Sequence, residues 1–125
     1  MDKVRLHPVE DVAWTRVAED TDRRTFDLDE EELKSSYAVH EPGDDETLQL
    51  FEVDSDPGCR VRIHAHDEDE IIYILKGERH FGRQVLRPGS SLFVKGKAFY
   101  SFAAGPEGLR FINFRPKADR AYHTR

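Results

Sequence analysis

The chain has 125 residues, enough for one domain with a hydrophobic core of its own. Its composition, 38% hydrophobic and 35% charged, is that of a globular protein rather than a disordered or collagen-like one. Nineteen basic against 25 acidic residues give a formal charge of -6, which argues against a nucleic-acid-binding protein, because such domains carry a positive excess. The single cysteine, Cys59, excludes an intramolecular disulfide and a cysteine-rich zinc site.

The chain shows no sign of membrane targeting. No apolar segment follows the first residues, so no signal peptide is expected. The longest apolar run, residues 71–75, is far too short to span a membrane. We therefore expect a cytoplasmic protein whose partner is a small molecule, with neither a membrane nor a nucleic acid as partner.

Residues 1–44 are predicted to form an arm and outer strands that pack on the rest of the domain. Residues 27–34 fit either a short helical turn or an acidic surface loop, since acidic residues suit a first helical turn but Leu28 and Leu33 make a thin apolar stripe. Trp14, Tyr37 and the alternation around Val39 could cover an open sheet edge, either in this chain or in a second copy.

From residue 40 onward, glycines and prolines divide the chain into pieces of about five to ten residues. The segments between them are rich in Val, Ile, Phe and Tyr, at 48–53, 61–66, 71–75, 91–94 and 109–114. Many short strands at regular spacing predict an all-β fold, an antiparallel sandwich or barrel. We expect its core over residues 45–116, followed by a C-terminal tail over 117–125.

The segment 58–77 carries the residues that point to chemistry. Residues two apart in a strand face the same side, so His64 and His66 direct their imidazoles into one volume. After a loop at 67–69, Glu70 opens the next strand, where its carboxylate can face the two imidazoles. Two histidines and one carboxylate on one side of a metal ion form a facial triad, which leaves coordination positions open.

The pattern of this segment is G-x5-H-x-H-x3-E-x6-G, filled by Gly58, His64, His66, Glu70 and Gly77. It resembles the first motif of the cupin superfamily, and the likeness covers about residues 45–115. The resemblance implies a small single-domain cupin, an RmlC-like jelly roll. It also implies a divalent metal, with iron preferred and zinc, manganese or nickel as alternatives, and a homodimer that pairs through edge strands and N-terminal segments.

The second motif of that family, G-x5-P-x-G-x2-H-x3-N, is divergent. Gly82 and Pro88 match it, but Tyr100 stands where the family has a metal-binding histidine, and Ala104 stands at the asparagine position. Tyr100 could bind the metal as a phenolate, act as an acid or base beside it, or only line the barrel. Two other histidines could replace the missing ligand, His40 and His80.

Strand alternation extends the predicted site. Arg62 shares the face of His64 and could bind a substrate carboxylate or enolate, or pair with a glutamate of the barrel. Other side chains expected to line the interior are Ile72, Ile74, Ala98 and Phe102. The alternation in 109–115 can be read in two ways: either Phe111 and Asn113 face the interior, or Arg110, Ile112 and Phe114 do.

Three functions fit these residues. The first is a metal-dependent oxidoreductase, a non-haem Fe(II) dioxygenase acting on a small oxygen-bearing molecule, because the facial triad leaves room for substrate and dioxygen. The alternative is a redox-neutral, metal-dependent lyase or isomerase that uses Tyr100 as acid or base. The third is a metabolite-binding cupin without catalysis. In either enzyme Tyr100 and Arg62 are the expected catalytic residues.

Overall fold

The structure is a computed structural model that describes residues 3–20 and 28–124. Two short 3-10 helices, η1 (Val9–Asp11) and η2 (Val17–Glu19), precede the main sheet. The strands are β1 (Thr15–Arg16), β2 (Ser35–Glu41), β3 (Gln49–Ser55), β4 (Arg60–Ala65), β5 (Glu70–Phe81), β6 (Gln84–Leu86), β7 (Ser91–Val94), β8 (Tyr100–Arg115) and β9 (His123–Thr124). The all-β prediction is confirmed, and the five segments expected as strands correspond to β3, β4, β5, β7 and β8.

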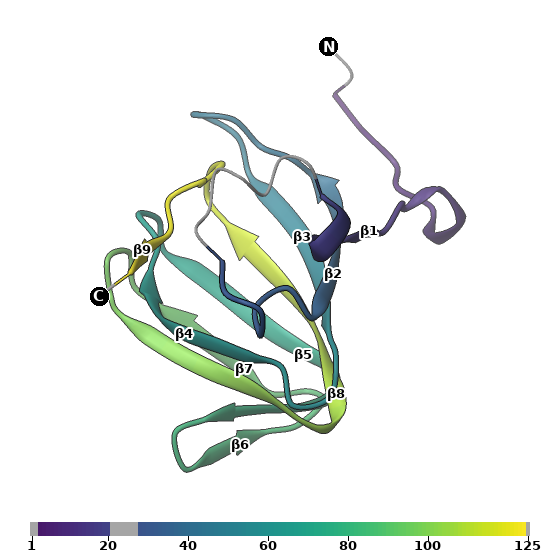
Figure 1. Ribbon diagram of the computed structural model, residues 1–125. Helices are drawn as coiled ribbons and strands as arrows, with labels where there is room; N and C mark the ends of the chain where they lie inside the picture. Colours follow the sequence, from purple (N-terminus) through teal and green to yellow (C-terminus); the bar gives the residue numbers. More distant parts are fainter. Residues whose placement is uncertain (1–2, 21–27, 125) are drawn as a thin grey trace.

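Strand β8 organises the sheet, because β3, β4 and β5 all pair with it. The hydrogen-bonded order is β1-β2-β3-β8-β4-β9, and β5 also pairs with β6 and β7. Every one of these pairings is antiparallel. The strands therefore wrap around an interior, with β4 and β9 facing β3 across it (Figure 1).

The ribbon of β5 and β8 bends sharply at two facing glycines. Gly77 (φ 74°) and Gly108 (φ 87°) adopt the left-handed region, which residues with a Cβ rarely enter. A straight strand of 16 residues would extend about 50 Å. Yet Tyr100 and Arg115, the two ends of β8, both contact the Glu70 carboxylate. The bend therefore brings the ends of β8 together, and Figure 1 shows the strand turning upward near its midpoint.

A register shift near the same bend changes which side chains of β5 face the interior. Before it, alternate residues Glu70, Ile72 and Ile74 are buried. The register with β8 then shifts on both sides of Gly77. Beyond the shift the buried residue is the odd-numbered Arg79, at 0% exposure, and not its even-numbered neighbours.

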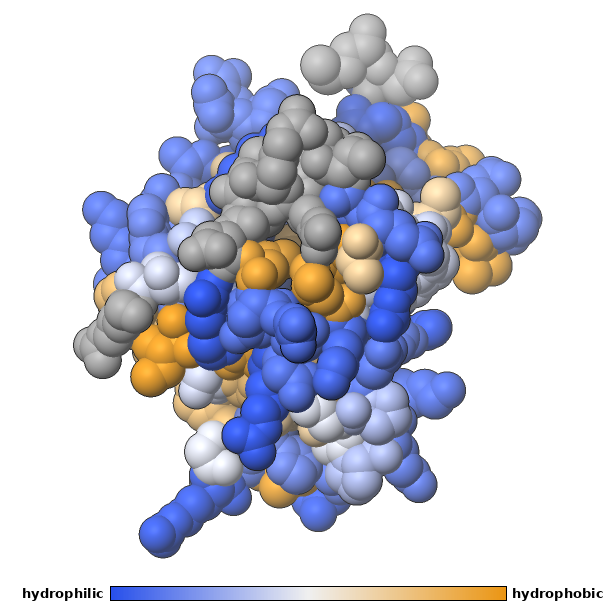
Figure 2. Space-filling model, viewed as in Figure 1, coloured by the Kyte–Doolittle hydropathy of each residue, from blue (hydrophilic) through white to orange (hydrophobic). Residues whose placement is uncertain are grey.

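The hydrophobic core lies between the two layers of the barrel. Its buried members are Cys59, Ile72, Ile74, Ala104, Leu109 and Phe111, and the partly buried Phe102 packs against them. Ile72, Ile74 and Phe102 thus face the interior as predicted. The prediction for Ala98 is wrong, because this residue is exposed in the turn before β8 and lies outside the strand whose alternation placed it. The face seen in Figure 2 is largely hydrophilic, with separate small hydrophobic patches.

The N-terminal segment is only partly attached to the barrel. β1 pairs with β2 through Thr15 and Tyr37, and Trp14 lies under the Arg110 guanidinium, 4.9 Å from its carbon. Before Trp14, Arg5 and His7 each pair with Glu41 of β2 at 2.7 Å. Beside these contacts apolar side chains such as Val4 and Leu6 are exposed, and Figure 1 shows the segment running along one edge of the barrel toward the N-terminus. Among the described residues, no helix is long and apolar enough to cross a membrane.

The acidic segment 27–34 forms a turn over its described part. Residues 30–33 are in turn conformation, and Asp27 lies outside the described residues. Asp29 and Glu32 exchange hydrogen bonds, since each side-chain oxygen accepts from the backbone N–H of the other residue at 2.9 Å. This reciprocal pattern closes a single turn, and no helix follows it. Of the two alternatives drawn from the sequence, a helical turn or a surface loop, the described part of the segment is the turn.

The bend predicts a large difference between two glycine substitutions. A Cβ on Gly77 would lie 2.1 Å from the carbonyl oxygen of Gly108, whereas a Cβ on Gly82 (φ 60°) would meet nothing within 4 Å. Gly82→Ala should lower the free energy of unfolding by about 1 kcal/mol, and Gly77→Ala by about 3 kcal/mol or more, because the backbone must also move. Urea denaturation of both variants measures the free energy of unfolding. Equal decreases for the two variants would contradict the close approach of Gly77 to Gly108.

Candidate active site

Two histidines meet at the end of β4. His64 pairs with Tyr100 across the β4–β8 ladder, and the His64 and His66 ring centroids are 4.9 Å apart. Nδ1 of His64 lies 2.8 Å from the Arg62 carbonyl oxygen, and Nδ1 of His66 lies 2.6 Å from that of Ala121. A nitrogen that bonds a carbonyl oxygen must be the protonated one, so Nε2 of each neutral ring keeps its lone pair.

Both imidazoles are held neutral by their surroundings. Burial lowers the pKa of His64 to about 4, against the opposing effect of its hydrogen bond to the Arg62 carbonyl. Burial, assisted by the charge of Arg115, also lowers the pKa of His66. At neutral pH the two Nε2 atoms are therefore available to accept a proton or to bind a metal.

Glu70 is the buried carboxylate that the sequence placed beside these rings. The Tyr100 hydroxyl donates to its Oε1 at 2.5 Å, and the Arg115 Nε–H donates to its Oε2 at 2.9 Å. Asn113 Nδ2 approaches Oε2 at 3.4 Å. Burial alone would raise the pKa of Glu70, but Arg115, His66 and the hydrogen bonds outweigh it, so the pKa is lowered and the carboxylate is charged.

Tyr100 is a protonated phenol in this arrangement. Burial and the adjacent Glu70 charge raise its pKa well above the usual range. Its ring lies 4.5 Å from the His64 ring and stacks at 6.4 Å on Phe102. Of the three roles left open by the sequence, the geometry favours a proton donor held by Glu70 over a phenolate ligand.

The residues fit a divalent metal only in part. His64 and His66 meet the requirements, because each fixes Nδ1 on a backbone carbonyl and leaves Nε2 unprotonated. Glu70 does not, because both its oxygens are engaged and the positive charge of Arg115 lies against them. Within residues 3–20 and 28–124, no three His, Cys, Asp or Glu side chains lie close enough together to hold one ion.

Arg62 lies in an ion pair, with its guanidinium carbon 5.9 Å from the centroid of the Tyr122 ring. Its Nε is 3.1 Å from Oε1 of Glu32, a buried carboxylate whose other oxygen accepts from the Tyr122 hydroxyl. This is the pairing with a barrel glutamate that the sequence left as the alternative to substrate binding. The two replacement histidines are also engaged elsewhere, His40 with Glu52 and His80 with Glu78, each at 3.0 Å.

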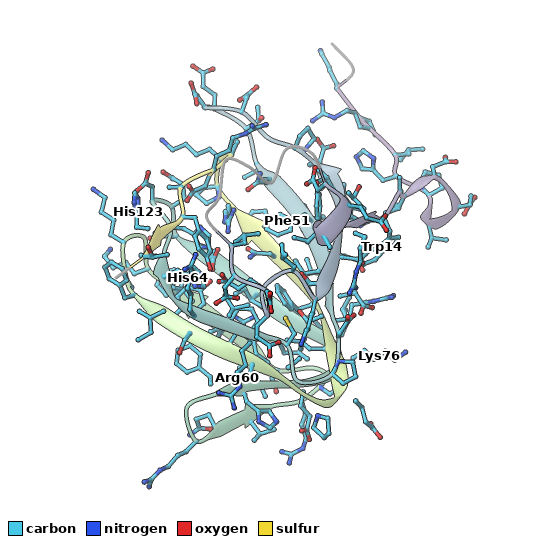
Figure 3. The ribbon with its side chains drawn as sticks, in the orientation of Figure 1. Trp14, Phe51, Arg60, His64, Lys76 and His123 are labelled. Carbon is cyan, nitrogen blue, oxygen red and sulfur yellow. The ribbon has the colours of Figure 1, made fainter. Side chains whose placement is uncertain are left out.

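The C-terminal tail completes the site, which the sequence did not indicate. β9 pairs with β4 next to His64. The Tyr122 ring stacks on the His64 ring at 4.7 Å and 13°, and the preceding carbonyl, that of Ala121, holds His66. Figure 3 shows His64 beneath the segment that carries His123. The residues 117–124 therefore cover the histidine pair rather than fraying from the barrel.

Two arginines of the interior were also missed by sequence reasoning. Arg115 is buried because the inward phase of 109–115 contains Phe111 and Asn113, one of the two phases that alternation allowed. Arg79 is buried only because the register of β5 shifts. Its guanidinium carbon lies 3.5 Å from the Phe102 ring centroid and 4.8 Å from that of Phe111.

Comparisons with known proteins place the fold among solved structures. No protein-family model and no curated protein matches the chain. A polyketide cyclase, RemF from Streptomyces resistomycificus, matches with TM-score 0.61 and 20% identity over 73% of this chain and 70% of the cyclase. An RmlC-like cupin from Ralstonia eutropha matches with TM-score 0.67 and 12% identity over 86% of this chain and 65% of its own.

A mutant of oxalate decarboxylase from Bacillus subtilis also matches, with TM-score 0.64 and 17% identity over 73% of this chain. The match covers only 28% of that enzyme. At these identities the likeness is one of fold, and it says nothing about substrate. The resemblance drawn from the first motif is confirmed at that level.

The geometry predicts how metal affinity responds to substitution. His64→Gln and His66→Gln should each weaken Co²⁺ binding at least tenfold, since each removes one of the two available nitrogen ligands. Tyr100→Phe should leave the affinity within about threefold, because the phenol is a donor to Glu70 and not a ligand. Titration followed by Co²⁺ absorbance and by calorimetry checks this. A loss with Tyr100→Phe as large as with the histidine variants would show that the tyrosine binds the metal.

Proposed function

We propose that this chain, which has the fold of the RmlC-like cupins, is an enzyme that catalyses redox-neutral proton transfer on a small oxygen-bearing organic molecule. Isomerisation, elimination and ring closure are reactions of this class. The observation that carries the proposal is the pairing of His64 with Tyr100. A neutral imidazole with a free Nε2 and a protonated phenol lie in the same buried volume, with their rings 4.5 Å apart.

A base and an acid so placed can act on two neighbouring atoms of one substrate. Nε2 of His64 accepts a proton from the carbon next to a carbonyl group, and the Tyr100 hydroxyl donates to the carbonyl oxygen, where negative charge develops. In an isomerisation His64 returns the proton to another carbon, and in an elimination the leaving group departs with that proton. In both reactions the enol hydroxyl gives its proton back to Tyr100 as the carbonyl group forms again, so both side chains regain their starting protonation states.

Glu70 and its partners hold the phenol ready for this role. The Tyr100 hydroxyl must turn from Glu70 toward the substrate, and Glu70 then keeps its bond to Arg115 at 2.9 Å. The carboxylate is thus never left as an unpaired buried charge, which would cost several kcal/mol. Apolar side chains of the core, Ile72 and Phe111 among them, keep water away from the reacting atoms.

The test is deuterium exchange into enolisable ketones in D2O. Phenylacetone and phenylpyruvate serve as probes, and NMR follows the loss of protons next to the carbonyl. The chain should accelerate exchange of at least one probe, and Tyr100→Phe and His64→Gln should each reduce the rate by about 10²–10⁴-fold.

Tyr73→Phe is the matched control, because this tyrosine points outward from β5 and loses the same hydroxyl. It should retain the full rate. Exchange by Tyr100→Phe as fast as by the unaltered chain, for every probe, would rule out the acid role of the phenol.

A metal-dependent oxygenase is the second candidate, and the orientation of the two histidines favours it. Both rings bond backbone carbonyls through Nδ1 and so keep Nε2 unprotonated, and their centroids are 4.9 Å apart, as in a pair of metal ligands. An iron ion held there, together with a freed Glu70, would supply oxygen chemistry. His64 and His66 would be its nitrogen ligands, and Tyr100 would orient the substrate.

Oxygen uptake decides between the two candidates. After anaerobic loading with Fe²⁺, the oxygenase predicts oxygen consumption on addition of catechol or 2,4-pentanedione, lost in both His64→Gln and His66→Gln. Proton-transfer chemistry predicts no consumption above that of free Fe²⁺. An oxygen electrode reads both outcomes from the same sample.

A further inference from the structure

Arg79 is a buried cation without a counter-ion. Its side chain is 0% exposed, and none of its three nitrogens has a partner at normal hydrogen-bond distance and angle among the described residues. The polar groups that act on it are the neutral Tyr100 hydroxyl and, from further away, the Glu70 charge. Burial lowers the pKa of Arg79 to about 10, which still leaves the guanidinium charged at neutral pH. An isolated charge in a protein interior is expensive, so a group of this kind normally has a partner.

The other buried charges all have partners. Glu70 pairs with Arg115 at 2.9 Å, and Glu32 pairs with Arg62 at 3.1 Å. The carboxylate of Asp119 accepts from the backbone N–H groups of Glu68 and Ala121. Arg79 is the exception among the described residues, and no carboxylate there lies within 4.0 Å of it.

The way in which Arg79 packs leaves its hydrogen-bonding edge unused. Its guanidinium carbon lies 3.5 Å from the Phe102 ring centroid, a cation–π contact that uses no N–H donor. The N–H groups of a guanidinium point outward in its plane, in the fork that matches a carboxylate. Stacking on Phe102 therefore fixes the orientation of the group without occupying its N–H donors.

The unused donors lie close to the proposed reacting groups. Arg79 Cζ is 6.0 Å from the Tyr100 ring centroid, and the charges of Arg79 and Glu70 act on one another and on His64. Phe102 also borders a surface hollow of about 610 Å³ between β4, β8 and the acidic turn. The ring on which Arg79 packs thus borders both the hydrophobic core and this hollow.

We infer that Arg79 binds the anionic group of the substrate, a monoanionic carboxylate or enolate attached to a flat apolar body. We infer a negative charge on the ligand because Arg79 lacks a counter-ion in the protein. We infer a flat apolar body because three aromatic rings lie around the guanidinium, those of Phe102, Phe111 and Tyr100. The inference adds a substrate class to the proposed function and shares its barrel interior. Its binding test does not depend on turnover.

Benzoate and its neutral isostere benzamide are the probes. The unaltered chain should bind benzoate at least tenfold more tightly than benzamide, measured by calorimetry and by the shift of the melting temperature. Arg79→Met keeps the length and the contact with Phe102 but removes the charge, and it should weaken benzoate at least tenfold without changing benzamide. Arg110→Met is the matched control, since Arg110 pairs with Asp54 on the partly exposed side of β8, and it should bind benzoate normally.

The melting temperature without ligand provides a second readout. An arginine buried for binding predicts that Arg79→Met is as stable as the unaltered chain or more stable, because an unpaired buried charge is removed. An arginine whose role is only to stack on aromatic rings predicts a less stable variant that binds benzoate unchanged, and this result would overturn the inference. Equal affinity of the unaltered chain for benzoate and benzamide would overturn it as well.

Two further measurements keep the inference testable and separate from the proposed function. If Arg79→Met does not fold, the Nε–H NMR signal of Arg79 in the unaltered chain should move on addition of benzoate and not of benzamide, and an unmoved signal counts against the inference. Tyr100→Phe should lose proton exchange but keep benzoate affinity. Arg79-dependent benzoate binding without any exchange activity would leave this inference standing and remove the proposed function alone.

Discussion

The buried Glu70 carboxylate is the group on which the rest of this structure depends. It lies at the start of β5 and accepts from both ends of β8, from Tyr100 at one end and Arg115 at the other. A carboxylate that accepts two hydrogen bonds in a dry interior is a strong constraint, because without Arg115 its buried charge would lack a counter-ion. The bend at Gly77 and Gly108 makes the two contacts possible at the same time, because it brings both ends of β8 to the same carboxylate. The two contacts in turn stabilise the bent form of the strand.

The same constraint sets the chemistry of the interior. Because Arg115 keeps Glu70 paired, the Tyr100 hydroxyl can turn from the carboxylate and act together with the two Nε2 atoms of the histidine pair. The tail that ends in β9 fixes these rings from the other side, through the Ala121 carbonyl and the Tyr122 ring. The site is therefore assembled from segments far apart in the sequence, and backbone carbonyls hold the two imidazoles in place, as catalysis by positioned groups requires.

The buried arginines of the barrel differ in whether a carboxylate pairs with them. Arg115 neutralises Glu70, and Arg62 neutralises Glu32, so these arginines belong to the scaffold. Arg79 carries the one buried charge in the described residues that the protein leaves without a partner of its own. Proteins accept the cost of such a group where a ligand supplies the missing charge, and natural sites of this kind are less stable without it.

The sequence by itself determined the all-β architecture and the first half of the site. Short β-rich segments between turn residues were enough for β3, β4, β5, β7 and β8. Alternation was enough to bring His64 and His66 together, because residues two apart in a strand face the same side. The same rule placed Ile72 and Ile74 in the core.

Only the tertiary structure decided the other half. Alternation does not predict a register shift, so the burial of Arg79 could not be derived from the sequence. Alternation also fits both orientations of 109–115, so the sequence did not determine whether Arg115 faces the interior. Likewise the partners of Glu70, Arg62 and His66 come from residues more than 25 positions away. Their choice depends on how the bent ribbon and the C-terminal tail close the barrel, which is a property of long-range packing and not of local spacing.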